Sequence, residues 1–251
     1  MLYLLLFCFV NNVLSKHINL DEENTVILKG PISLDTSSKF ITDLNTFNNK
    51  ELNIFITSPG GSVLEGMKII DHMKMLQNSG TITNCIVDFA ASMAFVITQA
   101  CDNRYSLSSG VLMQHQMSLS TGGPIENMYN YLKLINNINE DLDKMQAKKI
   151  NMNEDKFKNK ILNDWWLTAN EAKLLNVIDD IVTVNCNKYL YKNSYKHKIS
   201  NLFGDVEFTF SKCPLLREYL KIKFNKYIDD ETRYKIKNEY LINQYNQLFR
   251  L

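Results

Sequence analysis

The sequence predicts an α/β domain, in which helices pack on a sheet, followed by a C-terminal extension of different character. Between residues 25 and 182, short runs rich in β-branched residues alternate with segments whose apolar residues recur every three or four positions. Turn residues follow several of the short runs, as in Ser58–Ser62. Beyond Val182 the composition changes, because the last 69 residues hold ten Lys and three Arg against three Asp and four Glu. This order of elements is typical of an α/β architecture.

The overall composition is that of a globular chain with a substantial core. Hydrophobic residues make up 45% and charged residues 22% of the 251 positions, and the net charge of +1 gives no general case for binding nucleic acid or anionic membranes. The five cysteines include no CxxC pair and do not cluster with the four histidines, so we expect no zinc site. The thiols are expected to be buried or free. No cofactor is expected. The sequence contains no tract of 18 or more apolar residues, so no transmembrane span is predicted.

The N-terminus begins with a nine-residue apolar run, Leu2–Val10. Val13 and Ser15 suit the small-residue positions before a cleavage site, so residues 1–15 are interpreted as a secretory signal peptide. The segment before the run lacks a basic residue, and the alternative is a hydrophobic first strand or docking segment. A signal peptide would direct the chain to the secretory route or to an organelle reached through it; otherwise another organelle or the cytoplasm is expected.

The first half of the domain alternates strands and helices. The expected strands are Thr25–Gly30, Leu52–Thr57 and Thr81–Val87, and the expected helices are Ser33–Phe47 and Val63–Gln77. Ser62 and Glu65 have the spacing of a capping box at the start of the second helix. Because the strands are separated by helices, we expect them to lie parallel, with their carboxyl ends at one edge of the sheet.

The second half continues the same pattern. Short strands are expected at Arg104–Leu107, Val111–Met113 and Val177–Val182, and helices at Ile125–Ile150, Glu154–Leu162 and Ala169–Leu175. Thr168 and Glu171 predict another capping box. The helix from Ile125 carries an apolar stripe, which fits either an internal core or a surface for a partner helix.

The domain limits are predicted at residues 16–186, with residues 187–251 as a basic, Tyr-rich extension that is mostly helical. Within it, Asp205–Phe210 alternates like an edge strand, and Asp230–Phe249 predicts a helix with apolar residues along one side. Mixed basic and aromatic residues are also typical of nucleic-acid or membrane contacts. Interspersed Asp and Glu favour an amphipathic appendage that packs on its own domain or on a neighbour, and no nucleic-acid partner is expected.

Ser92 lies where an expected strand turns into an expected helix, and this position allows two interpretations. A serine there is commonly an N-cap, and on this feature alone capping is favoured. It is also a suitable place for a nucleophile, with His115 as a possible general base and Asp164 as the carboxylate that orients the imidazole. Backbone N–H groups at Gly60, Gly61 and Met93 could form the oxyanion hole that such a nucleophile requires.

Several segments, taken together and in order, resemble the Clp protease proteolytic subunit family. They are Val26–Pro31, Ser58-Pro59-Gly60-Gly61-Ser62-Val63, Ala90-Ala91-Ser92-Met93, Met113-Gln114-His115-Gln116, the run Asp164–Ala172 and the pair Ile178-Asp179. The resemblance implies Ser92 as nucleophile, His115 as general base and Asp164 as its partner. It places Gly61 and Met93, with Gly60 close by, at the oxyanion hole.

The resemblance further implies a crotonase-like repeated ββα fold and assembly into a homo-oligomeric ring, as a heptamer or a double heptamer. The implied activity is that of a serine endopeptidase acting on peptides or unfolded proteins. Alternatives are a catalytically weak or inactive ring subunit with an assembly or regulatory role, and an acyl-CoA enzyme on the same fold, which only the topology supports.

The sequence departs from the family pattern at two places that bear on function. Asp88 and Phe89 replace the family's glycine and glutamine just before the nucleophile motif, which removes any backbone geometry that only glycine allows. Only Lys16–Asn24 precedes the first strand of the domain, and this leaves little room for the axial loop and first helix that engage an unfoldase. The sequence therefore argues against docking to a Clp ATPase.

Overall fold

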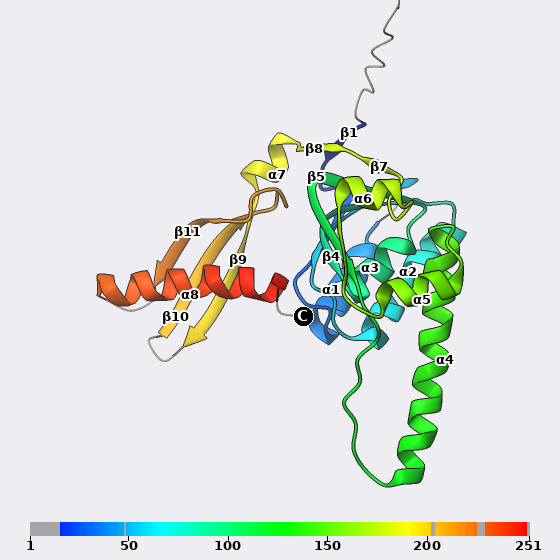
Figure 1. The fold of residues 1–251 in the computed structure, drawn as a ribbon. Helices are drawn as coiled ribbons and strands as arrows, with labels where there is room; N and C mark the ends of the chain where they lie inside the picture. The colour runs from blue at the N-terminus through cyan, green and yellow to red at the C-terminus, as the bar shows by residue number, and fades with distance from the viewer. Residues whose placement is uncertain (1–15, 48, 202–203, 225–228, 250–251) are drawn as a thin grey trace, which may run out of the picture.

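A computed structural model describes residues 16–47, 49–201, 204–224 and 229–249 (Figure 1). The predicted signal peptide, residues 1–15, lies outside the described residues. Within the described part of the chain, no helix combines the length and apolar character needed to cross a membrane.

The main sheet has six strands in the order β2-β3-β4-β5-β6, with β7 paired to β5. The strands are β2 (Thr25–Lys29), β3 (Glu51–Ser58), β4 (Ile82–Ala91), β5 (Asn103–Gln114), β6 (Trp165–Thr168) and β7 (Asp180–Ile181). The first four are parallel to one another, whereas β6 is antiparallel to β5. The carboxyl ends of β3, β4 and β5 therefore meet at one edge of the sheet, and the expected α/β architecture is confirmed.

Helices pack against this sheet and enclose the main core. They are α1 (Leu34–Asn45), α2 (Val63–Asn78), α3 (Met93–Gln99), α4 (Ile125–Lys149), α5 (Glu154–Ile161) and α6 (Ala169–Leu174). Their buried apolar residues recur three or four apart, as Phe40 and Leu44 do in α1. The capping box at α6 forms as predicted. The box at α2 forms only in half, because the Glu65 carboxylate binds Lys68 and the Ser37 hydroxyl instead.

Two expected strands merge into one. The segments predicted at 104–107 and 111–113 are both parts of β5, because the chain bulges between them: Val87 of β4 faces Ser106, while Phe89 faces Val111. The strand predicted at 177–182 shortens to β7. A further strand, β8 (Thr183–Cys186), pairs in parallel with β1 (His17–Leu20) in a separate two-stranded sheet.

The extension is built mainly from an antiparallel sheet, so the prediction of a mostly helical extension is wrong. After α7 (Lys188–Lys192), β9 (Ser194–Asn201), β10 (Gly204–Ser211) and β11 (Tyr219–Phe224) form a sheet in the order β11-β10-β9. The alternating segment therefore lies in a central strand, not in an edge strand. The outer strands alternate aromatic or apolar residues with polar ones, as Ile222 and Phe224 alternate with Lys in β11, so they carry a strand pattern that the prediction did not include.

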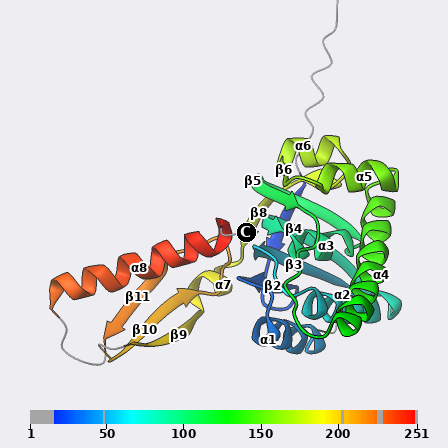
Figure 2. The ribbon, with the colours of Figure 1, turned by 60° about the horizontal axis from the view of Figure 1, so that its bottom comes forward.

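The predicted C-terminal helix is confirmed as α8 (Asp230–Phe249). Figures 1 and 2 show that α8 lies across the three-stranded sheet. Ile236 and Tyr240 pack against the buried face of β10, where the rings of Phe208 and Tyr240 stack with their centroids 4.1 Å apart. The extension thus has a small hydrophobic core of its own.

Four of the cysteines form disulfides, which corrects the expectation of free thiols. Cys85–Cys101 lies in the main core, where both residues are at most 1% exposed. Cys186–Cys213 joins the end of β8 to the segment that follows β10. The second disulfide therefore ties the extension covalently to the main domain.

Candidate active site

Ser92 occupies a sharp turn between β4 and α3. Its backbone has φ 54° and ψ −123°, and only two other described non-glycine residues have positive φ. A side chain disfavours this conformation, so the surrounding structure must hold it in place. The Ser92 N–H donates to the Met113 carbonyl at 2.9 Å, and the side chain makes no capping hydrogen bond. The hydroxyl is therefore not used as a helix cap.

Gly60 brings the turn after β3 against the backbone of Ser92. A Cβ built on Gly60 would lie 2.5 Å from the Ala91 carbonyl oxygen, 2.7 Å from the Ser92 Cβ and 2.8 Å from the Met93 nitrogen. The Gly60 φ of +87° also favours glycine. The turn is held from its other side by Ile32, whose N–H donates to the Gly60 carbonyl at 2.7 Å.

A small cavity of about 80 Å³ collects most of the predicted site residues. Gly61, Ser92, Met93 and His115 all line it. His115 follows the last residue of β5 and is half-buried. It reaches the cavity because β5 lies beside β4, so that the two strands end next to each other. Gly60 is not among the lining residues, although it touches the backbone of Ser92.

Asp164, like Gly60, is a predicted site residue that does not line this cavity. β5 and β6 pair with Gln114 opposite Trp165, and continuing this antiparallel register by one residue places His115 opposite Asp164. Residues opposite each other in such a pair have Cβ atoms about 4.5–5.5 Å apart. The Asp164 side chain is nevertheless exposed. Both residues belong to the described part of the chain, and no hydrogen bond joins their side chains.

The opposite wall of the cavity comes from α4, which sequence reasoning did not assign to the site. Asn139, Asp143 and Gln146 line the cavity, and Gln114 donates from Nε2 to Gln146 Oε1 at 2.6 Å. Asp143 is 4% exposed, and this burial raises the pKa of its carboxyl group. The three polar residues are spaced four and three apart beside the apolar stripe of the helix, and this was the one sequence signal available.

Asp88, one of the two departures from the family pattern, lies in the bulge of β4. It has no partner in either neighbouring ladder, because the register of β4 shifts between Val87 and Phe89 on both sides. Its side chain is buried, accepts a hydrogen bond from Thr57 Oγ1 at 2.9 Å and forms an ion pair with Arg217 of the extension. The charge of the carboxylate is thus neutralised by the extension, and its ion-pair partner is Arg217, not His115.

Replacing Arg217 with glutamine is expected to lower the free energy of unfolding by about 1–2 kcal/mol. The change leaves the Asp88 carboxylate buried without its cation, while the exposure of the Arg217 side chain moderates the loss. Urea unfolding measures this change in the free energy of unfolding. In an Asp88→Asn background the same change should cost clearly less; equal costs in both backgrounds would show that the two side chains are not coupled.

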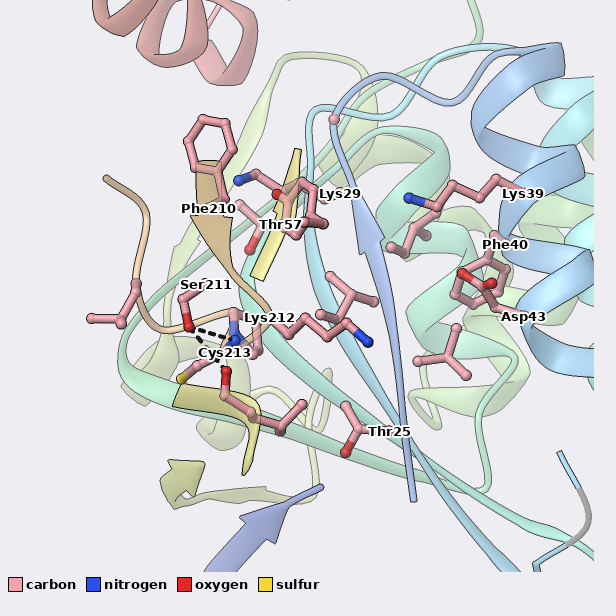
Figure 3. Close-up of a pocket in the computed structure, with 18 of the residues that line it drawn as sticks. Thr25, Lys29, Lys39, Phe40, Asp43, Thr57, Phe210, Ser211, Lys212 and Cys213 are labelled. Atoms are coloured by element: carbon pink, nitrogen blue, oxygen red, sulfur yellow. Dashed lines mark hydrogen bonds between the residues drawn. The ribbon is translucent and has the colours of Figure 1, made fainter. Parts of the chain in front are cut away.

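A larger cavity of about 700 Å³ lies elsewhere and contains none of the predicted site residues. Figure 3 shows its walls, with Thr25 and Lys29 from β2, Lys39 and Asp43 from α1, and Phe210 from β10. It therefore lies between the first strand of the main sheet and the extension. Among the residues that the structure describes, no group of His, Cys, Asp and Glu side chains is placed to hold a metal ion.

Comparison with models of protein families gives one further finding. The model of the family described as Clp protease matches residues 11–185. The matched region includes the turn after β3, Ser92, His115 and Asp164, and it ends within β8, before the extension begins.

Proposed function

Because this chain belongs to the Clp protease family, we propose that it is a serine endopeptidase that hydrolyses peptides or unfolded proteins on the crotonase-like fold of that family. One observation carries the proposal: Ser92 is held in a strained turn, against a glycine loop, in a cavity shared with His115. This is the geometry that a serine nucleophile needs, with its hydroxyl free and a base at hand.

The proposed reaction proceeds through an acyl-enzyme. Ser92 Oγ attacks the carbonyl carbon of the scissile peptide bond while His115 accepts the hydroxyl proton. The N–H groups of Gly61 and Met93 stabilise the oxyanion, and Gly60 gives their backbone room to converge. His115 then protonates the leaving amine, and water releases the acyl group by the reverse sequence. Asp164 is the proposed partner of the imidazole, with a hydrogen bond that forms when substrate or a neighbouring subunit orders it.

The surface of α4 supports assembly into a ring. The N-terminal half of this helix projects beyond the body of the domain in Figure 1, and Ile125, Tyr129 and Leu132, which are spaced four and three apart on one side of it, are all exposed. An apolar helix face of this kind is expected to pack against another subunit. We propose a heptamer or a double heptamer, which native mass measurement would distinguish from a monomer.

Two structural features support the remaining proposals about cellular context. The disulfides fit an oxidising compartment, as expected if residues 1–15 direct secretion, and N-terminal sequencing of the mature chain would test this. The segment before β2 holds the strand β1 (His17–Leu20) rather than the first helix by which the family engages an unfoldase, and this argues against docking to a Clp ATPase.

A fluorophosphonate probe tests the nucleophile directly. We expect the assembled protein to be labelled at Ser92, identified by mass spectrometry of the modified peptide. The alternative function, an inactive ring subunit, predicts normal assembly with an unlabelled Ser92, and the exposed position of Asp164 is the observation that favours it.

A further inference from the structure

Asp143 is a buried carboxyl group that the proposed mechanism does not use. It lies on α4, lines the same cavity as Ser92 and His115, and is 4% exposed. Its Oδ2 accepts a hydrogen bond from Asn139 Nδ2 at 3.0 Å. Among the described residues, no Lys or Arg forms an ion pair with it; Lys158, the cation that most affects it, is paired with Glu154 at 2.8 Å.

A buried carboxylate without a cation is costly, because it loses hydration that a single amide hydrogen bond does not replace. Burial accordingly raises the pKa of Asp143. The charge of Lys158 and the hydrogen bond from Asn139 lower this pKa, but by less than burial raises it. A cation that entered the cavity would therefore stabilise the ionised carboxyl group. The cavity should bind a cationic group more tightly than a neutral one of the same size.

The remaining walls suit a long side chain with an apolar stem. Val63, Val96, Met117 and Leu142 line the cavity together with Asp143. Lys and Arg side chains bury their methylene stems against apolar surfaces while their charged ends seek a polar partner. The volume of about 80 Å³ suits part of one side chain, since sites for whole small-molecule ligands usually measure about 300–1,000 Å³.

We propose that Asp143 is a specificity-determining residue that selects substrates with Lys or Arg at the residue whose carbonyl carbon Ser92 attacks. The side chain of that residue lies nearest to the nucleophile, and the cavity opens beside Ser92 and Met93. This inference rests on the proposed peptidase function.

Matched peptide substrates that differ only in Arg or Leu at this residue test the proposal. We expect wild-type protein to favour Arg in kcat/KM, and Asp143→Asn to lower the Arg-to-Leu ratio about 30-fold or more, because the buried end of a cationic side chain loses its charged partner. Asp141→Asn is the matched control: it removes the same charge from an exposed position of α4 and should keep the ratio. An Asp143→Asn ratio equal to that of wild type overturns the proposal.

The pH dependence of the same ratio separates recognition from a structural role. As pH falls through the raised pKa of Asp143, the carboxyl group is protonated and the preference for Arg should be lost. Any effect of pH on the acyl-transfer chemistry that the two substrates share slows both alike and cancels in the ratio. Lys158, Glu154 and Glu140 also act on Asp143 and are present in every variant. A wild-type ratio that does not change with pH, or an Asp143→Asn ratio that does, contradicts the proposal.

A binding experiment remains informative without catalysis. In Ser92→Ala protein, the product-like peptide acetyl-Ala-Ala-Arg should bind more tightly than acetyl-Ala-Ala-Leu by calorimetry, and adding Asp143→Asn should remove the difference. Equal binding of the two peptides overturns the inference even if the wild-type enzyme hydrolyses peptides. Selective binding with no hydrolysis by wild type would instead reject the peptidase function and retain the recognition role of Asp143.

Discussion

Replacing Ser92 with alanine is expected to lower kcat for peptide hydrolysis by about 10⁴–10⁶-fold. The loss should be this large because acyl transfer has no other nucleophile, and the oxyanion donors alone retain only a small residual acceleration. The free energy of unfolding should change little, since the hydroxyl makes no capping hydrogen bond and alanine meets the same strain at φ 54°. Progress curves with a fluorogenic peptide measure the effect.

The control for this variant is Ser109→Ala, which removes a hydroxyl from an exposed position of β5 away from the cavity. Its kcat should equal that of wild type. Hydrolysis by Ser92→Ala at the wild-type rate, with contaminating peptidases excluded by the control preparation, would reject Ser92 as the nucleophile.

The parts of the site that could be predicted from sequence are those fixed by local chain order. Ser92 and His115 each follow a β-type run, and parallel strands bring such positions to one edge of the sheet. Asp143 could not be found this way. It lies next to Leu142 on α4, and helical periodicity does not say which turn of a long helix reaches the cavity.

Contacts between distant segments account for the other differences. β10 was visible as an alternating segment, but its central place depends on pairing with both β9 and β11, and alternation within a strand does not say which strands pair. Disulfide pairing cannot be deduced from cysteine spacing alone. Arg217 contacts Asp88 across 129 positions of sequence, so only the fold could show that the Asp88 carboxylate binds the extension.

Replacing Gly60 with alanine is the second change for which we expect a large effect, a loss of about 10³-fold in kcat/KM. The added Cβ would overlap the Ala91 carbonyl, the Ser92 Cβ and the Met93 nitrogen, at 2.5–2.8 Å. Relief of this overlap requires the nucleophile or the oxyanion amide to move. Losing one oxyanion donor costs about 10²–10³-fold, and displacing a reacting group by about 1 Å costs about 10²-fold.

Gly80→Ala separates this effect from backbone strain. Gly80 has φ +93°, close to the +87° of Gly60, but a Cβ at Gly80 meets no atom within 4 Å. Both variants should therefore lose about 1–2 kcal/mol of stability from the left-handed conformation, whereas only Gly60→Ala should lose activity and fluorophosphonate labelling. If thermal unfolding shows Gly60→Ala folded and its kcat/KM matches that of Gly80→Ala, the close contact of the loop after β3 with Ser92 does not position the nucleophile.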